Sequence, residues 1–232
     1  MVPRSTVFGL IGLSAGLTLA VFSCSESTPS TSVLISVASS QTDVFEAFEQ
    51  QYEDSHPDID VRLNVGGSTT LINQIDEGAS VDVVVVADQQ AADAVTGNIV
   101  EREILSTNEL VAIRFIEAPP IQTVDDLSNP ELLVAACDES LPCGRLTQAV
   151  LDRIPRAIEI DSREPNVRLV RSRVAAGEVD VGFVYRSDLF DAPAEVVPLE
   201  LDLGGLASDV VVLQLTDSPL VDELFTAIVS MT

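Results

Sequence analysis

Short runs of small and polar residues lie where the sequence predicts that an extended apolar segment meets a helix. Three such runs are Ala38-Ser39-Ser40, Gly66-Gly67-Ser68-Thr69 and Pro142-Cys143-Gly144, and the pair Val184-Tyr185, beyond a turn at Asn166-Val167, completes the set. The first turn of a helix leaves backbone N–H groups without partners inside the helix, and Ser and Tyr add hydroxyl donors. Donors that converge in this way can hold a small anion.

Each of these residues also has a purely structural interpretation, because Ser, Gly and Thr are common at helix caps and in turns of any α/β chain. Ser40 and Ser68 could be simple helix caps, and Tyr185 could be a core residue whose hydroxyl is satisfied by the backbone. Arg145 and Arg168 are expected to be solvated or paired with acidic residues. Two acidic residues at predicted strand ends, Asp82 and Asp88, are expected to hold the local structure.

The composition limits the classes of partner. The chain has 232 residues, 46% of them apolar, which is enough to fill the core of one large or two small α/β domains. It carries 37 acidic residues against 12 basic ones, all arginine, for a formal net charge of −25. Nucleic acid is therefore excluded as an expected partner, since binding its backbone needs a cationic face.

The N-terminus has the pattern of an export signal. Arg4 precedes an apolar run over residues 7–22, and Ser23-Cys24 follows. We expect residues 1–23 to be a signal peptide, Cys24 to be the lipidated first residue, and residues 24–32, rich in Ser, Thr and Pro, to be a tether. An ordinary cleaved signal or an uncleaved anchor helix is the alternative. The protein is expected at the outer face of the cytoplasmic membrane or in the periplasm.

The two remaining cysteines, Cys137 and Cys143, lie in a short loop of a chain expected to be exported. In an oxidising compartment we expect them to form a disulfide that stiffens the turn at 142–144, with two reduced thiols as the alternative. No direct metal site is expected, because the single histidine, His56, is far away in sequence.

Apolar periodicity predicts alternating strands and helices. The first helix is expected to bury Val44, Phe45, Phe48 and Tyr52 and to begin with a capping box of Asp43 and Glu46. The run Val81 to Ala87 is nearly all valine, which is typical of a parallel strand covered on both faces. The expected strands are 33–38, 60–65, 81–87, 109–116, 132–136, 179–185 and 210–215, and the expected helices are 43–52, 70–77, 144–154, 166–176 and one from 219.

Alternation of this kind implies right-handed crossovers and doubly wound sheets, in which ligands lie at the carboxyl ends of strands. A break at Ala118-Pro119-Pro120 begins a second α/β unit, and the tail returns to the first pattern. The expected architecture is a two-lobed α/β fold with a ligand cleft between the lobes. Residues 33–109 and 200–232 form the first lobe, and residues 110–199 form the second.

Seven segments, in order, resemble the periplasmic molybdate-binding proteins of ABC importers, which are two-lobed solute-binding proteins. The resemblance covers nearly all of the chain after the tether. The matching segments are 37–42, 66–71 with Gln74-Ile75, 81–89, 141–145, 166–168, 177–180 and 182–185.

The resemblance implies an oxyanion site without cationic side chains. It places Ser40 and Ser68 as hydroxyl and amide donors from the first lobe, Cys143 and Val167 as amide donors from the second, and Tyr185 as a phenol donor. A tetrahedral dianion offers only acceptors, so a cage of donors suits it, and helix N-termini add partial positive charge.

The implied function is capture of molybdate or tungstate and delivery to a membrane permease with a cytoplasmic ATPase, by a monomer that needs no cofactor. The alternative ligand is another small oxyanion such as sulfate or phosphate. A serine hydrolase is the alternative class. It lacks support because the chain has no Gly-x-Ser-x-Gly elbow and His56 is the only imidazole that could serve as a base.

Overall fold

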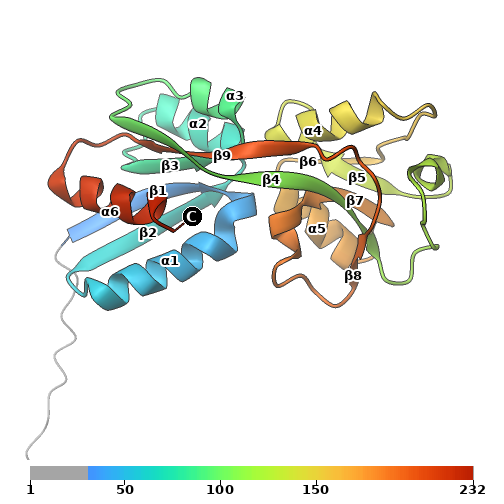
Figure 1. Ribbon diagram of the computed structural model, residues 1–232, viewed down its shortest axis with the longest axis horizontal. Helices are drawn as coiled ribbons and strands as arrows, with labels where there is room; N and C mark the ends of the chain where they lie inside the picture. Colours follow the sequence, from blue (N-terminus) through green and yellow to red (C-terminus); the bar gives the residue numbers. More distant parts are fainter. Residues whose placement is uncertain (1–30, 232) are drawn as a thin grey trace, which may run out of the picture.

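The computed structural model describes residues 31–231, and the predicted signal peptide, the lipidation site at Cys24 and most of the tether lie outside this range. The chain forms two lobes that lie side by side (Figure 1). The elements in chain order are β1 Thr31–Ala38, η1 Ser39–Gln41, α1 Thr42–Ser55, β2 Ile59–Gly66, α2 Ser68–Asp76, β3 Val83–Val86, α3 Gln89–Asp93, β4 Glu101–Phe115, η2 Val124–Ser128, β5 Val134–Cys137, α4 Pro142–Leu151, β6 Ser162–Glu164, α5 Val167–Ala175, β7 Val181–Tyr185, η3 Arg186–Leu189, β8 Val196–Leu199, β9 Ala207–Gln214 and α6 Pro219–Val229. None of the helices within residues 31–231 is long and apolar enough to cross a membrane.

The strands follow the order β2-β1-β3-β9-β4-β7-β5-β6, and β8 pairs with β4. β1 lies parallel to β2 and β3, whereas β9 runs antiparallel to β3 and β4. The long strand β4 serves both lobes, because its residues 101–109 pair with β9 and its residues 110–115 pair with β7 and β8. In Figure 1, β4 and β9 run together from one lobe to the other. They are the two connections between the lobes.

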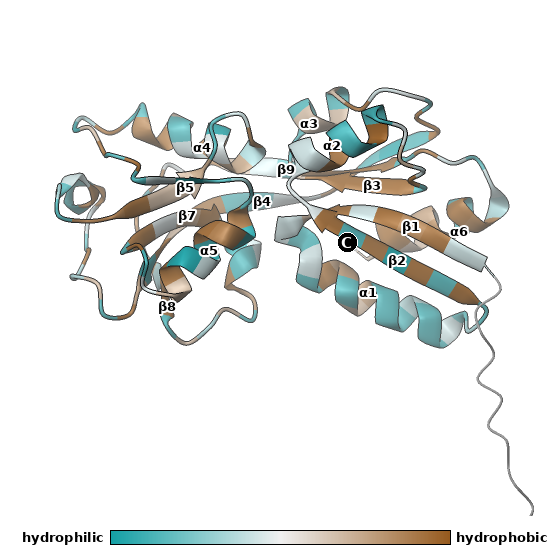
Figure 2. Ribbon diagram, turned by 180° about the vertical axis from the view of Figure 1, so that it is seen from behind, coloured by the Kyte–Doolittle hydropathy of each residue, from teal (hydrophilic) through white to brown (hydrophobic). Residues whose placement is uncertain are grey.

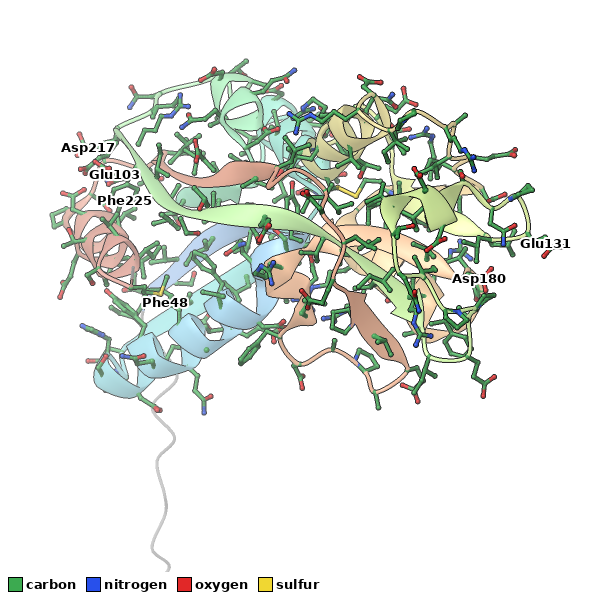
Figure 3. The ribbon with its side chains drawn as sticks, turned by 45° about the vertical axis from the view of Figure 1, so that its right-hand side comes forward. Phe48, Glu103, Glu131, Asp180, Asp217 and Phe225 are labelled. Atoms are coloured by element: carbon green, nitrogen blue, oxygen red, sulfur yellow. A yellow bond between two sulfur atoms is a disulfide. The ribbon has the colours of Figure 1, made fainter. Side chains whose placement is uncertain are left out.

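Helices cover both faces of each half of the sheet. In the first lobe, α1 and α6 pack on one face around Phe48 and Phe225, which lie in the same buried cluster (Figure 3). α2 and α3 cover the other face over the valines of β3. In the second lobe, α5 packs on one side of β5 and β7, and Val150 of α4 packs on the other. Figure 2 shows apolar colour along β1 and β3 and more polar colour along α1. The predicted fold class is therefore confirmed.

Three local predictions are wrong. β4 begins at Glu101, well before the predicted start at 109. No side chain caps α1, so the capping box of Asp43 and Glu46 does not form, because the chain enters the helix directly from η1 and the Asp43 carboxylate bonds to Arg168 instead. Val44 is 46% exposed, although Phe45 on the same predicted face is buried. Two short strands, β6 and β8, and helix α3 were not predicted at all.

Candidate functional site

A small cavity lies between the lobes at the carboxyl ends of β1, β3, β5 and β7. Its volume is about 20 Å³, and all five residues predicted as oxyanion donors line it. The first lobe contributes Ala38, Ser39, Ser40, Gly67, Ser68 and Ala87, and the second contributes Leu141, Pro142, Cys143, Asn166, Val167 and Tyr185. The structure thus brings the predicted residues together, as expected for a site at the ends of parallel strands. That they hold a ligand stays a prediction.

Two serine hydroxyls of the first lobe supply donors to this cavity. Ser40 Oγ is buried and has no hydrogen-bond partner within residues 31–231. Ser68 Oγ accepts a hydrogen bond from the backbone N–H of Ala87 at 3.0 Å, so its own proton remains to be donated. A buried hydroxyl without a partner is costly, and a bound acceptor relieves that cost.

Tyr185, at the end of β7, places a phenol at the same cavity. It is 1% exposed, and its hydroxyl accepts a hydrogen bond from Ser208 Oγ of β9 at 3.4 Å. Burial raises the pKa of Tyr185 well above its usual value of 10, and the nearby carboxylate of Asp88 adds to this. The phenol therefore keeps its proton at neutral pH and can act as a donor.

Three helices begin at the cavity, since α2 begins at Ser68, α4 at Pro142 and α5 at Val167, and all three residues line it. The amides of Ser68, Cys143 and Val167 belong to first turns, so they have no acceptor inside their own helices. The Asn166 side chain caps α5 by accepting a hydrogen bond from the N–H of Leu169 at 3.0 Å. This cap does not engage the N–H of Val167. The helix dipoles add partial positive charge at the same point.

A disulfide joins Cys137, the last residue of β5, to Cys143 in the first turn of α4, and it is the yellow bond in Figure 3. The adjacent Gly144 can only be glycine, because an added Cβ would lie 1.9 Å from the carbonyl oxygen of Asp138. The disulfide and this close approach hold the N-terminus of α4 against the end of the strand, with the Cys143 amide at the cavity.

Within the part of the chain that the structure describes, no arginine or acidic side chain lines the cavity. Arg145 forms an ion pair with Asp88, and Arg168 forms one with Asp43 at 2.7 Å, so of the two expected states, solvated or paired with acids, both arginines adopt the second. Asp82 Oδ2 accepts from the N–H of Leu34 at 2.9 Å. Asp88 caps α3 by accepting from the N–H of Ala91 at 2.7 Å. Both aspartates therefore hold local structure, as predicted.

The cavity offers donors without a formal charge. No group of three or more His, Cys, Asp or Glu residues within 31–231 is arranged to hold a metal ion. The single histidine, His56, is not among the residues that line the cavity, and its Nδ1 lies 2.9 Å from the carbonyl oxygen of Tyr52 at the end of α1. An anion that presents only acceptors fits this set of groups.

The two lobes are in close contact around the cavity. An added Cβ on Gly67 of the first lobe would lie 2.7 Å from the carbonyl oxygen of Pro165 in the second. Ser187 Oγ of η3 donates to the carbonyl oxygen of Ser40 at 2.9 Å. The sequence reasoning missed Ser187 and Ser208, because neither lies at a junction of small residues between a strand and a helix. The structure is therefore a closed arrangement in which both lobes surround the cavity.

The comparisons with known proteins agree with this geometry. A family model for bacterial extracellular solute-binding proteins matches residues 33–230. The molybdate-binding protein ModA of Mycobacterium tuberculosis is 28% identical over 242 residues, which cover 95% of this chain and 93% of that protein. A putative ABC transporter substrate-binding lipoprotein of Bacillus subtilis, YvgL, is 28% identical over 73% of this chain and 71% of its own length.

Among solved structures, the periplasmic molybdate-binding protein of Azotobacter vinelandii superposes with a TM-score of 0.68. The match covers 86% of this chain and 92% of that one, at 16% sequence identity. An identity this low supports the two-lobed fold alone.

Proposed function

The chain belongs to the family of bacterial extracellular solute-binding proteins, and from that premise we propose that it captures molybdate or tungstate between its lobes and delivers it to an ABC importer. The similarity to ModA over 95% of the chain supports the choice of ligand. Binding of this kind is reversible and involves no covalent chemistry.

One observation carries the proposal: the buried hydroxyl of Ser40 has no hydrogen-bond partner among residues 31–231 and lines the same cavity as the other proposed donors. A fully deprotonated tetrahedral oxyanion has acceptors on every side, which matches a wall of hydroxyls and amides. Phosphate keeps a proton at neutral pH and needs an acceptor for it, yet no carboxylate of the described residues lines this cavity. The donor set therefore favours molybdate, tungstate or sulfate over phosphate.

A neutral cage also explains how a chain with a net charge of −25 can bind an anion. Oriented amide and hydroxyl dipoles act at contact distance, whereas the field of distant surface carboxylates is screened by salt. Because each lobe supplies only part of the donor set, ligand binding stabilises the closed state over the open one.

The remaining parts of the proposal concern organisation in the cell. We propose residues 33–109 and 200–232 as the first lobe and residues 110–199 as the second, with a signal peptide, a lipidated Cys24 and a tether before them. The similarity to the lipoprotein YvgL supports the anchor. The chain would then act as a monomer outside the cytoplasmic membrane. Its partners would be the permease and ATPase of an importer. A hydrolase is not favoured, because His56 is not at the cavity.

Titration calorimetry on the chain from Ser25 onward, which leaves out only the signal peptide and the proposed lipid-bearing Cys24, tests the proposal. The protein is freed of bound ligand by unfolding and refolding with its disulfide intact, and molybdate, tungstate, sulfate and phosphate are titrated in parallel. We expect tight one-to-one binding of molybdate and tungstate, with sulfate far weaker and phosphate weakest. Binding of sulfate alone would keep the site and change the ligand, and no binding of any of the four would refute the proposed function.

A further inference from the structure

The η1 turn carries Ser39 and Ser40 in the first lobe, and two groups of the second lobe donate hydrogen bonds to its carbonyl oxygens. Arg168 Nε of α5 donates to the carbonyl oxygen of Ser39 at 3.0 Å. Ser187 Oγ of η3 donates to the carbonyl oxygen of Ser40 at 2.9 Å. Both bonds cross from one lobe to the other, so they exist only while the cleft is closed.

These bonds bear on the donors of the cavity because of peptide geometry. In a trans peptide the carbonyl and the N–H of the next residue point in opposite directions. The carbonyl of Ser39 shares its peptide plane with the N–H of Ser40, so a donor that fixes the carbonyl also fixes that amide. Hydrogen bonding to the carbonyl polarises the whole peptide unit and makes its N–H a stronger donor.

Arg168 is itself firmly placed between the lobes. Its Nη2 lies 2.7 Å from Asp43 Oδ2 of α1 in the first lobe, and its Nε lies 3.3 Å from Asp188 Oδ1, a buried carboxylate of the second lobe. It also directly follows Val167, which lines the cavity. The Arg168 side chain thus links the η1 turn of the first lobe to helix α5 of the second.

Ser187 is placed by the strand that connects the lobes. Asn108 of β4 donates from Nδ2 to Ser187 Oγ at 2.8 Å, and the N–H of Ser187 donates to Asn108 Oδ1 at 3.3 Å. The Ser187 hydroxyl accepts one hydrogen bond from Asn108 and donates its own hydrogen bond to the carbonyl oxygen of Ser40.

We propose that Arg168 and Ser187 are positioning residues that lock the η1 turn onto the second lobe, and that they strengthen retention of the oxyanion without touching it. The inference rests on the proposed function. Loss of either bond lowers the population of the closed state, and the apparent affinity falls in proportion for every ligand that needs closure. A residue that contacts the ligand would instead change the preference among ligands.

The test uses Arg168→Lys and Ser187→Ala. Lysine keeps a positive charge beside the buried Asp188. Its ammonium group, however, lacks the planar guanidinium geometry with which arginine bonds Asp43 and the Ser39 carbonyl at the same time. Arg163→Lys is the matched control, because Arg163 pairs with Glu139 inside the second lobe at 2.7 Å. The mature disulfide-bonded chain is titrated with tungstate and sulfate. Its unfolding midpoint is measured without ligand, and small-angle X-ray scattering measures its closure.

For each of the two variants we expect the Kd for tungstate to rise about 2- to 10-fold, as for loss of one ordinary hydrogen bond. The ratio of the tungstate and sulfate affinities should stay the same, and the scattering should show less closure at subsaturating tungstate. The ligand-free midpoint should stay within error of wild type in Arg168→Lys, and it should fall in Ser187→Ala because the buried Asn108 Nδ2 loses its acceptor. Arg163→Lys should leave every readout at the wild-type value.

Unchanged Kd values in both variants, with wild-type binding intact, would overturn the inference and leave the proposed function standing. A changed ratio of tungstate to sulfate would also overturn it, since it would make these residues part of the ligand contact. If the wild-type chain binds no oxyanion at all, the proposed function fails and the inference falls with it.

Discussion

Ser40→Ala separates ligand binding from stability more cleanly than any other change at the cavity. The Ser40 hydroxyl is buried and forms no hydrogen bond within residues 31–231, so its removal breaks no contact of the protein itself. If the hydroxyl donates to a bound oxyanion, alanine removes a hydrogen bond to a charged group, which is worth about 1.5 to 3 kcal/mol. The Kd should then rise about 10- to 150-fold.

Ser68→Ala makes the informative comparison, because that hydroxyl has a second role. Ser68 Oγ accepts from the N–H of Ala87 at 3.0 Å, and both residues lie in the first lobe. Alanine therefore leaves a buried N–H without an acceptor, which costs about 1 to 3 kcal/mol of folding stability whether the cleft is open or closed. We expect Ser68→Ala to lose both affinity and stability, whereas Ser40→Ala loses affinity alone.

Two assays are needed, calorimetric titration with molybdate for affinity and urea unfolding of the ligand-free chain for stability. Ser230→Ala serves as the control, because it removes an exposed hydroxyl that bonds only to the carbonyl oxygen of Ala227 at the end of α6. Wild-type affinity in Ser40→Ala would refute the role of that hydroxyl. A loss of ligand-free stability in Ser40→Ala equal to that of Ser68→Ala would refute the claim that the hydroxyl lacks a protein partner.

Three further predictions concern the phenol, the closure and the buried carboxylate. Tyr185→Phe removes a donor at the cavity and should weaken molybdate binding by about 1 to 3 kcal/mol in the same titration, and an unchanged affinity would remove Tyr185 from the site. Gly67→Ala places a Cβ 2.7 Å from the Pro165 carbonyl oxygen only when the lobes meet. It should therefore weaken molybdate binding by about 1 to 3 kcal/mol and leave the ligand-free unfolding midpoint unchanged. A fall in that midpoint would contradict this. Burial raises the pKa of Asp188 to about 6, although the positive charge of Arg168 opposes this. The folded chain therefore binds a proton at this carboxyl more tightly than the unfolded chain does, which contributes about 3 kcal/mol to the free energy of unfolding. This contribution is fully present below about pH 4 and is lost as the pH rises through 6. Urea unfolding across this range should show the loss in the wild type but not in Asp188→Asn, and parallel curves would contradict the assignment.

Much of the fold follows from local patterns that tertiary structure does not override. The valine run at β3 is buried on both faces, as its composition indicated, and Asn166, the residue before α5, caps that helix. That the runs of small residues lie around one cavity was also predictable, because small residues at a strand-to-helix junction lie at the carboxyl edge of a parallel sheet. The choice of Ser40, Ser68, Cys143, Val167 and Tyr185 as donors came from the family resemblance and stays a prediction. Their order along the chain matched that of a known family.

Other features depend on partners that are distant in sequence. The start of β4 at Glu101 was missed because its first residues are polar and exposed, and only the pairing with β9 makes them a strand. Asp43 has the spacing of a helix cap, yet Arg168, 125 residues away, takes its carboxylate. The contacts of Ser187 with Asn108 and Ser40 are equally nonlocal. No periodicity in the sequence encodes such pairs.

The position of the oxyanion between the lobes can be seen in a crystal structure of the mature chain with tungstate, because tungsten is located independently by anomalous scattering. If neutral donors hold a tetrahedral oxyanion there, we expect one strong peak in the cavity. Its oxygens should lie in hydrogen-bond reach of the hydroxyls of Ser40, Ser68 and Tyr185 and of the amides of Cys143 and Val167. An empty cavity, or tungsten bound only at surface arginines, would contradict this expectation.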